Sequence, residues 1–159
     1  MSSKEHDVQP DVDVSETVGA SPADVYALVA DLPRMGEWSP ENTGGRWLNG
    51  ANGPSVGAKF RGTNRSGWRF WSTTVTVRSA EVGRQFAFDV DALGLPVATW
   101  AYTFAETPEG CLVTETWTDR RPGWMRSASG PLMGVRDRAE HNRANMQETL
   151  RRLKAAAER

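Results

Sequence analysis

Cysteine and histidine are scarce in this chain of 159 residues, which has one cysteine and two histidines. With Cys111 alone no intrachain disulfide can form, and a zinc site would lack its usual cluster of cysteine and histidine ligands. The glycine-rich stretch 50–57 is not followed by the lysine and serine or threonine of a phosphate-binding loop. We therefore expect no metal site and no cofactor.

Long hydrophobic runs and an excess of charge of one sign are also absent. No stretch approaches the length of a membrane span, about 20 apolar residues, and the polar residues 1–10 do not resemble the apolar core of a signal peptide. The 19 basic and 20 acidic side chains give a net charge of −1, which provides no broad electrostatic surface for nucleic acid. We expect a cytoplasmic protein, monomeric or homodimeric, that neither binds nucleic acid nor inserts into a membrane.

Tryptophan, in contrast, is abundant, with seven residues beside five phenylalanines and only two tyrosines. Large aromatic side chains bury much apolar area and are typical of concave apolar surfaces. The length and the ordinary share of charged residues suit one globular domain with a real core. We assign residues 11–159 to this domain and residues 1–10 to a flexible N-terminal tail.

Hydrophobic spacing predicts an α+β fold that begins with a strand and a short helix. Apolar residues with a period of two predict a first strand over Val12–Val18. Ser21 is suited to cap a helix over Pro22–Asp31, because its side chain accepts from the free backbone N–H groups of the first turn. A short turn follows over residues 34–37. The stretch 44–57 is rich in glycine and asparagine, and we interpret it as a short strand and a loop.

Five further strands are predicted in the middle of the chain, separated by residues that favour turns. No helix lies between them, so neighbouring strands should pair antiparallel. The strands are Lys59–Arg65, Trp68–Ala80, Gln85–Asp91, Ala98–Glu106 and Leu112–Asp119. The turns are expected at Ser66-Gly67, Val82-Gly83, Leu95-Pro96 and Pro108-Glu109-Gly110.

The end of the chain has helical spacing. From about Leu132, residues suited to a core-facing side recur every three or four positions. This spacing predicts a helix of about twenty residues, roughly 30 Å long. The inward stripe consists of Val135, Ala139, Asn142, Met146, Thr149, Leu150 and Leu153.

Alternation along the strands places large aromatic and a few polar side chains on the inward face. Glu115 and Asp119 share this face with Trp117, and buried polar groups are costly without a partner or water. We therefore expect a cavity between the sheet and the terminal helix, although aromatic strand residues are also common in an ordinary core. The candidate ligand-binding residues are Trp38, Trp47, Phe60, Asn64, Arg69, Trp71, Thr73, Phe88, Trp100, Tyr102, Glu115, Trp117, Met133, Asn142 and Met146.

Three segments of the sequence resemble one known family: Ala20–Asp31 (ASPADVYALVAD), Glu37–Pro40 (EWSP) and Val113–Asp119 (VTETWTD). Together with one long terminal helix, they resemble the polyketide cyclase/dehydrase-like branch of the SRPBCC superfamily, which includes START lipid-transfer domains and birch-pollen-allergen-like proteins. The resemblance covers residues from about 12 to 157. It implies a helix-grip fold, in which a curved antiparallel sheet wraps around a long C-terminal helix and two short helices follow the first strand.

The same resemblance implies lipids, polyketides, hormones or other hydrophobic molecules as ligands. Members of the superfamily differ widely in chemistry and many only bind, so the fold does not determine the activity.

Residues that could perform acid–base catalysis are few. His6 lies in the tail, and His141 lies far around the predicted helix from the inward stripe, so we expect it to face solvent. Cys111 is expected to be a small core residue. Glu115 and Asp119 remain as candidate catalytic residues, with Tyr102 as a proton donor, because burial raises the pKa of a carboxyl group toward a useful range.

Either Arg69 or Arg61 could supply a counter-charge for Glu115. A simple ion pair between Glu115 and one of these arginines, which would order the pocket without chemistry, is the alternative interpretation.

Three functions remain open from the sequence. The first is a protein that binds a small hydrophobic molecule, with Asn64, Glu115 and Asn142 orienting its polar end. The second is a cyclase or dehydratase that uses a carboxylate of the pocket. The third is a protein-binding module in which the arginine-rich region from Arg120 to Arg143, with Trp124, docks an acidic surface.

Overall fold

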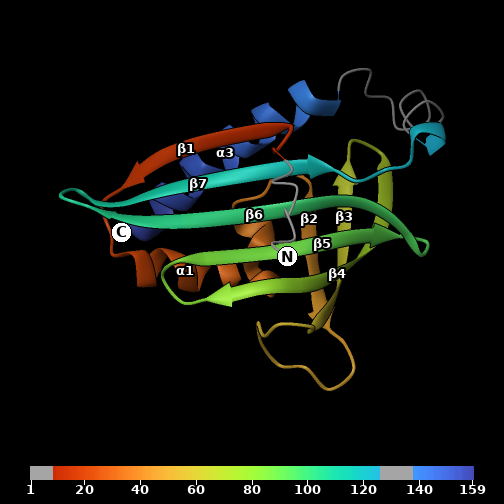
Figure 1. Cartoon of the computed structure of the whole chain (residues 1–159), viewed down its shortest axis with the longest axis horizontal. Helices are drawn as coiled ribbons and strands as arrows, with labels where there is room; N and C mark the ends of the chain where they lie inside the picture. Colours follow the sequence, from red (N-terminus) through yellow and green to blue (C-terminus); the bar gives the residue numbers. More distant parts are fainter. Residues whose placement is uncertain (1–8, 126–137) are drawn as a thin grey trace, which may run out of the picture.

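The computed structural model describes residues 9–125 and 138–159. Seven strands form one antiparallel sheet in the order β1-β7-β6-β5-β4-β3-β2 (Figure 1). Apart from the step from β1 to β2, which the two short helices bridge, each strand pairs with the next one along the chain, and β1 closes the sheet against β7. The strands are β1 Val12–Val18, β2 Asn42–Trp47, β3 Lys59–Ser66, β4 Arg69–Glu81, β5 Gln85–Ala92, β6 Leu95–Thr107 and β7 Gly110–Asp119.

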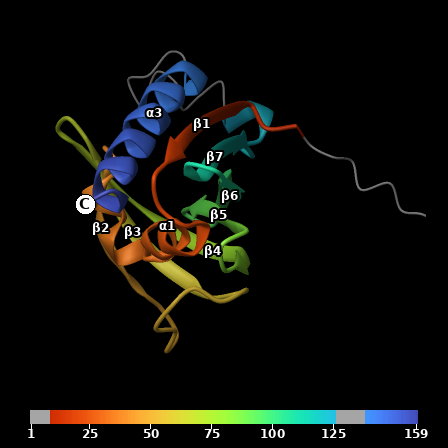
Figure 2. The ribbon, with the colours of Figure 1, turned by 90° about the vertical axis from the view of Figure 1, so that its left-hand side faces the viewer.

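The fold also includes the helices α1 (Pro22–Ala30), η1 (Leu32–Glu37), which is a 3-10 helix, and α3 (Arg138–Ala157), and residues 123–125 are helical as well. Viewed from the end, the sheet curves from β1 round to β2, and α3 lies across its concave side (Figure 2). This arrangement is the expected helix-grip fold, with a curved antiparallel sheet, a long C-terminal helix and two short helices after the first strand. None of the helices in the described ranges is both long and apolar enough to span a bilayer.

The local signals for α1 are confirmed. The Ser21 side chain accepts a hydrogen bond from the backbone N–H of Asp24 at 3.2 Å, and Pro22 occupies the first helical position. The next element, η1, is a 3-10 helix that begins at Leu32 rather than a turn confined to residues 34–37.

One predicted turn was wrong. The chain reverses between β5 and β6 at Leu93-Gly94, where both residues have positive φ values of 52° and 75°, and not at Leu95-Pro96. Two consecutive residues with positive φ are the geometry of a tight hairpin turn that matches the twist of its strands. The sequence favoured the proline as the turn residue, but Pro96 lies within β6.

Side-chain alternation is confirmed in the core. A large cluster contains the inward residues of the middle strands together with α1 and the end of α3, including Phe60, Val77, Phe86, Val113 and Leu150. A smaller cluster of Val12, Ala98, Trp117 and Met146 packs the other half of α3 against the sheet. Cys111 is fully buried in the large cluster, as expected for a core residue.

Candidate ligand-binding cavity

A cavity of about 370 Å³ lies between the concave face of the sheet and α3. Strands β3 to β7, η1 and α3 all contribute to its wall. Eleven of the candidate residues named from the sequence line it: Phe60, Asn64, Trp71, Thr73, Phe88, Trp100, Tyr102, Glu115, Trp117, Asn142 and Met146. The structure thus brings most of the inward-facing candidates together around one space.

Large rings form much of the wall. Five of these rings, Phe60, Trp71, Phe88, Trp100 and Trp117, come one each from strands β3 to β7, and all face the cavity because they share the inward side of the pleat. Trp100 and Trp117 are cross-strand partners on β6 and β7. Such a wall offers flat apolar surfaces for a ring-containing or long-chain ligand.

A buried pair of polar side chains interrupts this apolar wall. Tyr102 and Glu115 are directly opposite each other on β6 and β7, and the tyrosine hydroxyl donates to Glu115 Oε1 at 2.7 Å. Both residues are almost completely buried, with 3% and 2% of their surface exposed. Glu115 Oε2 has no hydrogen-bond partner among the described residues.

The electrostatics of this pair follow from its burial. Loss of hydration raises the pKa of Glu115 to about 8, even though the hydrogen bond from Tyr102 lowers it. Burial, followed by the charge and hydrogen bond of Glu115, raises the pKa of Tyr102 well above its ordinary value. Glu115 is therefore mostly protonated at neutral pH and can act as a proton donor within an apolar cavity.

The counter-charge expected for Glu115 is not there. Arg61 is exposed on the outer face of β3, and the Arg69 guanidinium stacks over the Trp68 ring with 5.0 Å between its central carbon and the ring centre. Neither arginine lines the cavity. The interpretation of Glu115 as one half of an ion pair with these arginines is wrong for the described structure.

The helical wall supplies a further polar group. Asn142 is buried, lines the cavity, and its side chain makes no hydrogen bond within the described part of the chain. Thr149 lies two turns further along the same face of α3. Its hydrogen-bonding capacity is used, because its hydroxyl donates to the Asn145 carbonyl at 2.8 Å. Asn142 is thus the second polar group with unused hydrogen-bonding capacity in the wall.

A charged cluster ties the start of α3 to the segment that precedes β2. Glu41 accepts from Arg138 at 3.2 Å and contacts His141 Nε2 at 2.5 Å, and Asn145 also contacts that nitrogen at 3.2 Å. His141 keeps 31% of its side chain exposed and does not line the cavity, but its ring also contacts Glu41, which the helical spacing did not predict. Glu41, Arg138 and Asn145 line the cavity.

Three further candidates lie elsewhere, and a fourth is not described. Trp38 is buried beneath η1 with Arg34 above its ring, and Trp47 packs edge-on against Phe60 at 5.3 Å, outside the cavity wall. Asp119 is held in an ion pair with Arg121 at 2.8 Å and does not line the cavity. Met133 lies outside the described residues.

Sequence reasoning missed several wall residues. Leu32 and Met35 come from η1, Val97 and Arg121 lie near strand ends, and Met125 lies in the helical residues 123–125. Strand alternation carries no information about such positions. Only the helical spacing of Leu32 and Met35 could have indicated that both side chains point to the same side.

The described arginines of the arginine-rich region near the end of the chain are engaged in contacts within the protein. Arg120 pairs with Asp89 and Asp91, and Arg143 donates to the backbone carbonyl of Asp13. Arg126 and Arg136, also part of the arginine-rich region, lie outside the described residues. Within residues 9–125 and 138–159, no three His, Cys, Asp or Glu side chains lie close enough together to hold a metal ion.

Solved structures of similar shape support the fold. A protein from Chromobacterium violaceum superposes with a TM-score of 0.71 and 14% identity, over 93% of this chain and 97% of that one. The di-domain ARO/CYC protein StfQ gives a TM-score of 0.72 and 19% identity over 92% of this chain and 50% of StfQ. A Polyketide_cyc-like protein from Corynebacterium glutamicum is 29% identical over 96% of this chain and 91% of its own length, with a TM-score of 0.57.

Comparison with sequences gives the family. No curated protein matches the chain significantly. The family model for polyketide cyclase/dehydrase and lipid transport proteins matches residues 9–158, which include every strand and helix described above. The protein is therefore a member of the polyketide cyclase/dehydrase and lipid transport family.

Proposed function

We propose that the protein binds a small hydrophobic molecule, such as a lipid, a polyketide or another apolar or aromatic metabolite, in the cavity between the sheet and α3. The observation that carries this proposal is a space of about 370 Å³ walled by six aromatic side chains. Pockets of this size bury most of the surface of a small organic ligand.

The polar groups of the wall support a ligand with at least one polar end. Glu115 Oε2 is buried with no hydrogen-bond partner among the described residues, which costs about 1 to 3 kcal/mol for a buried polar group, and Asn142 is a second polar group of the wall. A ligand oxygen that reaches either group would recover part of that cost. Apolar contacts would supply most of the affinity, and these two groups would set the orientation.

The names of two similar structures agree with this ligand class. StfQ is a di-domain ARO/CYC protein from the steffimycin biosynthetic pathway. DynU16 is described as a putative protein in the dynemicin biosynthetic locus. It is 19% identical over 91% of this chain and 45% of DynU16, with a TM-score of 0.61. For this chain, these names support a polyketide as one of the ligands to test.

A cyclase or dehydratase is the second candidate function, and the position of Glu115 favours it. In its ionised form the carboxylate would remove a proton alpha to a ligand carbonyl, and the enolate carbon would attack a second carbonyl to close a ring. Glu115 would then return the proton to the alkoxide oxygen. A pKa of about 8 suits a group that both accepts and donates a proton near neutral pH.

The experiment that tests the proposal is native mass spectrometry of the purified protein, followed by tryptophan-fluorescence titration with fatty acids, sterols and aromatic polyketides. A co-purified ligand or saturable quenching by one class supports binding, and no response to any class contradicts it. The variant Glu115→Gln separates the two candidate functions. Binding retained with no turnover by either protein supports a carrier, whereas turnover by the wild type that the variant loses supports an enzyme.

A further inference from the structure

The charge of the chain is unevenly distributed. Residues 42–80 contain six of the 19 basic residues and none of the 20 acidic residues. This stretch comprises β2, β3 and nearly all of β4, which form one edge of the sheet. The net charge of −1 therefore conceals a strongly basic part of the surface.

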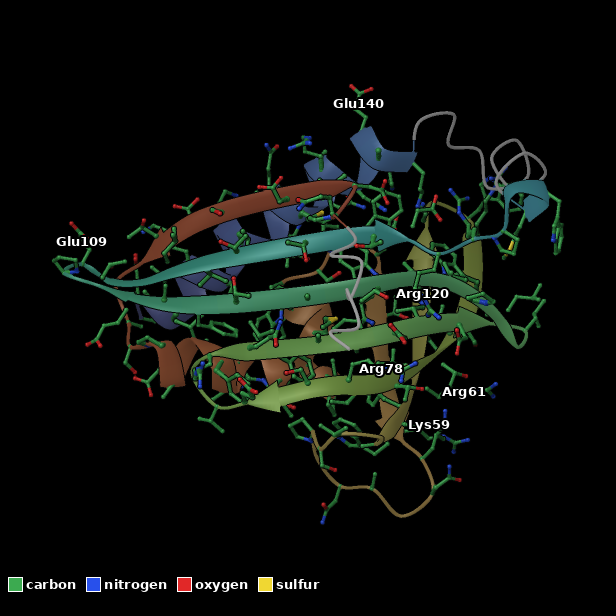
Figure 3. All side chains as sticks on the ribbon, viewed as in Figure 1. Lys59, Arg61, Arg78, Glu109, Arg120 and Glu140 are labelled. Atoms are coloured by element: carbon green, nitrogen blue, oxygen red, sulfur yellow. The ribbon has the colours of Figure 1, made fainter. Side chains whose placement is uncertain are left out.

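Four of these six basic side chains are exposed and form no ion pair with a described residue, whereas Arg78 pairs with Asp89 and Arg69 is partly buried. Arg46, Lys59, Arg61 and Arg65 lie on β2 and β3, and none forms an ion pair with a described residue. Arg46 and Arg61 are direct cross-strand partners, an arrangement in which two like charges repel. Figure 3 shows Lys59 and Arg61 projecting away from the sheet. Unrelieved repulsion on an exposed face points to an anionic partner.

Exposed aromatic side chains extend this face at the turn between β3 and β4. Trp68 is 79% exposed and Phe70 is 70% exposed. The Arg65 guanidinium stands 5.2 Å from the Phe70 ring centre, and that of Arg69 stands 5.0 Å from Trp68. The headgroup region of a bilayer accommodates both aromatic rings and guanidinium groups. A surface that combines Trp and Phe with Arg is therefore suited to this region.

We propose that this surface, defined by Arg46, Lys59, Arg61, Arg65, Trp68 and Phe70, docks the protein peripherally on an anionic phospholipid bilayer. The cations contact lipid phosphates and the two rings reach the headgroup region, without any membrane span. This proposal goes beyond ligand binding and does not depend on the identity of the ligand.

Two further observations favour a bilayer over a nucleic acid. Leu93 is fully exposed at a positive φ of 52°, a conformation that is strained for leucine, and it offers nothing to a phosphate backbone or a base. Its turn lies toward the same end of the long axis as the β3–β4 turn (Figure 1). In addition, Asn64 and Trp71 on the inner face of the same hairpin line the cavity, so the docking surface and the cavity share their strands.

The test is flotation of the full-length protein with phosphatidylcholine vesicles, with and without phosphatidylglycerol. We expect binding only to the vesicles that contain phosphatidylglycerol, lost when ionic strength is raised to about 1 M because the Debye length falls to about 3 Å. Arg61→Gln with Arg65→Gln should weaken binding about thirtyfold, since each surface cation contributes about fivefold. Trp68→Ala with Phe70→Ala should abolish it.

Matched variants control for charge and for exposed apolar area. Arg151→Gln with Arg159→Gln removes the same charge from α3 and the residue two positions after it, and Val56→Ala with Val82→Ala truncates two side chains that are each 71% exposed; both double variants should bind vesicles like the wild type. Thermal unfolding monitored by circular dichroism confirms that each variant is folded.

Three results would overturn the proposal: no binding to either vesicle, equal loss of binding in the control variants, or equal or tighter binding to oligothymidylate through the same residues. The last result would assign the surface to nucleic acid.

Discussion

The protonation of Glu115 makes a prediction for how stability depends on pH. The folded protein holds the pKa of this carboxyl at about 8, against 4.5 for an ordinary glutamate. Between these two values the folded state binds a proton that the unfolded chain releases, so the free energy of unfolding must fall as pH rises. Below the lower value the stabilisation is fully present, and above about pH 8 no further loss from this group occurs.

The magnitude follows from the two pKa values. Each pH unit between them costs at most about 1.4 kcal/mol, so the full loss is about 5 kcal/mol. The variant Glu115→Gln keeps the size of the side chain, stays neutral at every pH and lacks this titration. We therefore expect the wild type and the variant to differ little near pH 5, and the wild type to be less stable than the variant by several kcal/mol near pH 8.5.

The assay is urea unfolding of both proteins, followed by tryptophan fluorescence, at a series of pH values across this range. Subtracting the variant from the wild type removes the contribution of every other titrating group. Glu109→Gln, at the exposed turn between β6 and β7 (Figure 3), is the matched control for replacing a carboxyl group by an amide. A difference between wild type and Glu115→Gln that does not change with pH would refute a protonated, desolvated Glu115.

Three other variants test the cavity and the fold. Tyr102→Phe removes the hydroxyl that lowers the pKa of Glu115. In the preceding assay, the pH at which the stability loss levels off should therefore move upward. The free energy of unfolding in urea should fall by about 1 to 2 kcal/mol. Asn142→Leu replaces a buried amide without a partner among the described residues, so we expect unchanged or slightly higher thermal stability but weaker calorimetric binding of a hydroxylated ligand relative to its hydrocarbon analogue; a clear loss of stability would contradict this. Gly110→Ala would place a methyl group 2.5 Å from the Val18 carbonyl oxygen at a φ of 138° and should cost more than about 2 kcal/mol, whereas Gly53→Ala, with no atom within 4 Å, should change the midpoint of thermal unfolding little.

Much of the fold and of the cavity wall could be predicted because strand side chains alternate strictly. Once β4, β6 and β7 were recognised, the inward positions of Trp71, Tyr102 and Glu115 followed from the period of two. The pairing of Tyr102 with Glu115 also required the register of β6 against β7, which depends on the turn at residues 108–109. The sequence predicted both side chains to face inward, but not that they contact each other.

Other features depend on contacts that local patterns do not report. Glu41 and His141 meet across a separation of 100 residues, and helical spacing alone assigned His141 to solvent. Arg69 is two residues from Trp71, so strand alternation assigns both side chains to the same face. Arg69 is, however, the first residue of β4, next to the turn, and its guanidinium reaches the exposed Trp68 ring. Trp38 and Trp47 point into the protein as predicted, but an inward direction does not distinguish core packing from a cavity wall.

The central claim, that the space between the sheet and α3 receives an apolar ligand, is tested most directly by titration with the neutral fluorescent dye N-phenyl-1-naphthylamine. The wild type is compared with Ala98→Phe, which adds a ring at a buried position of the cavity wall, and with Ala105→Phe, which adds one on the exposed face of the same strand. We predict saturable dye fluorescence for the wild type and for Ala105→Phe, and its loss for Ala98→Phe in a folded protein. Equal dye binding by Ala98→Phe, or no binding by the wild type, would contradict the claim.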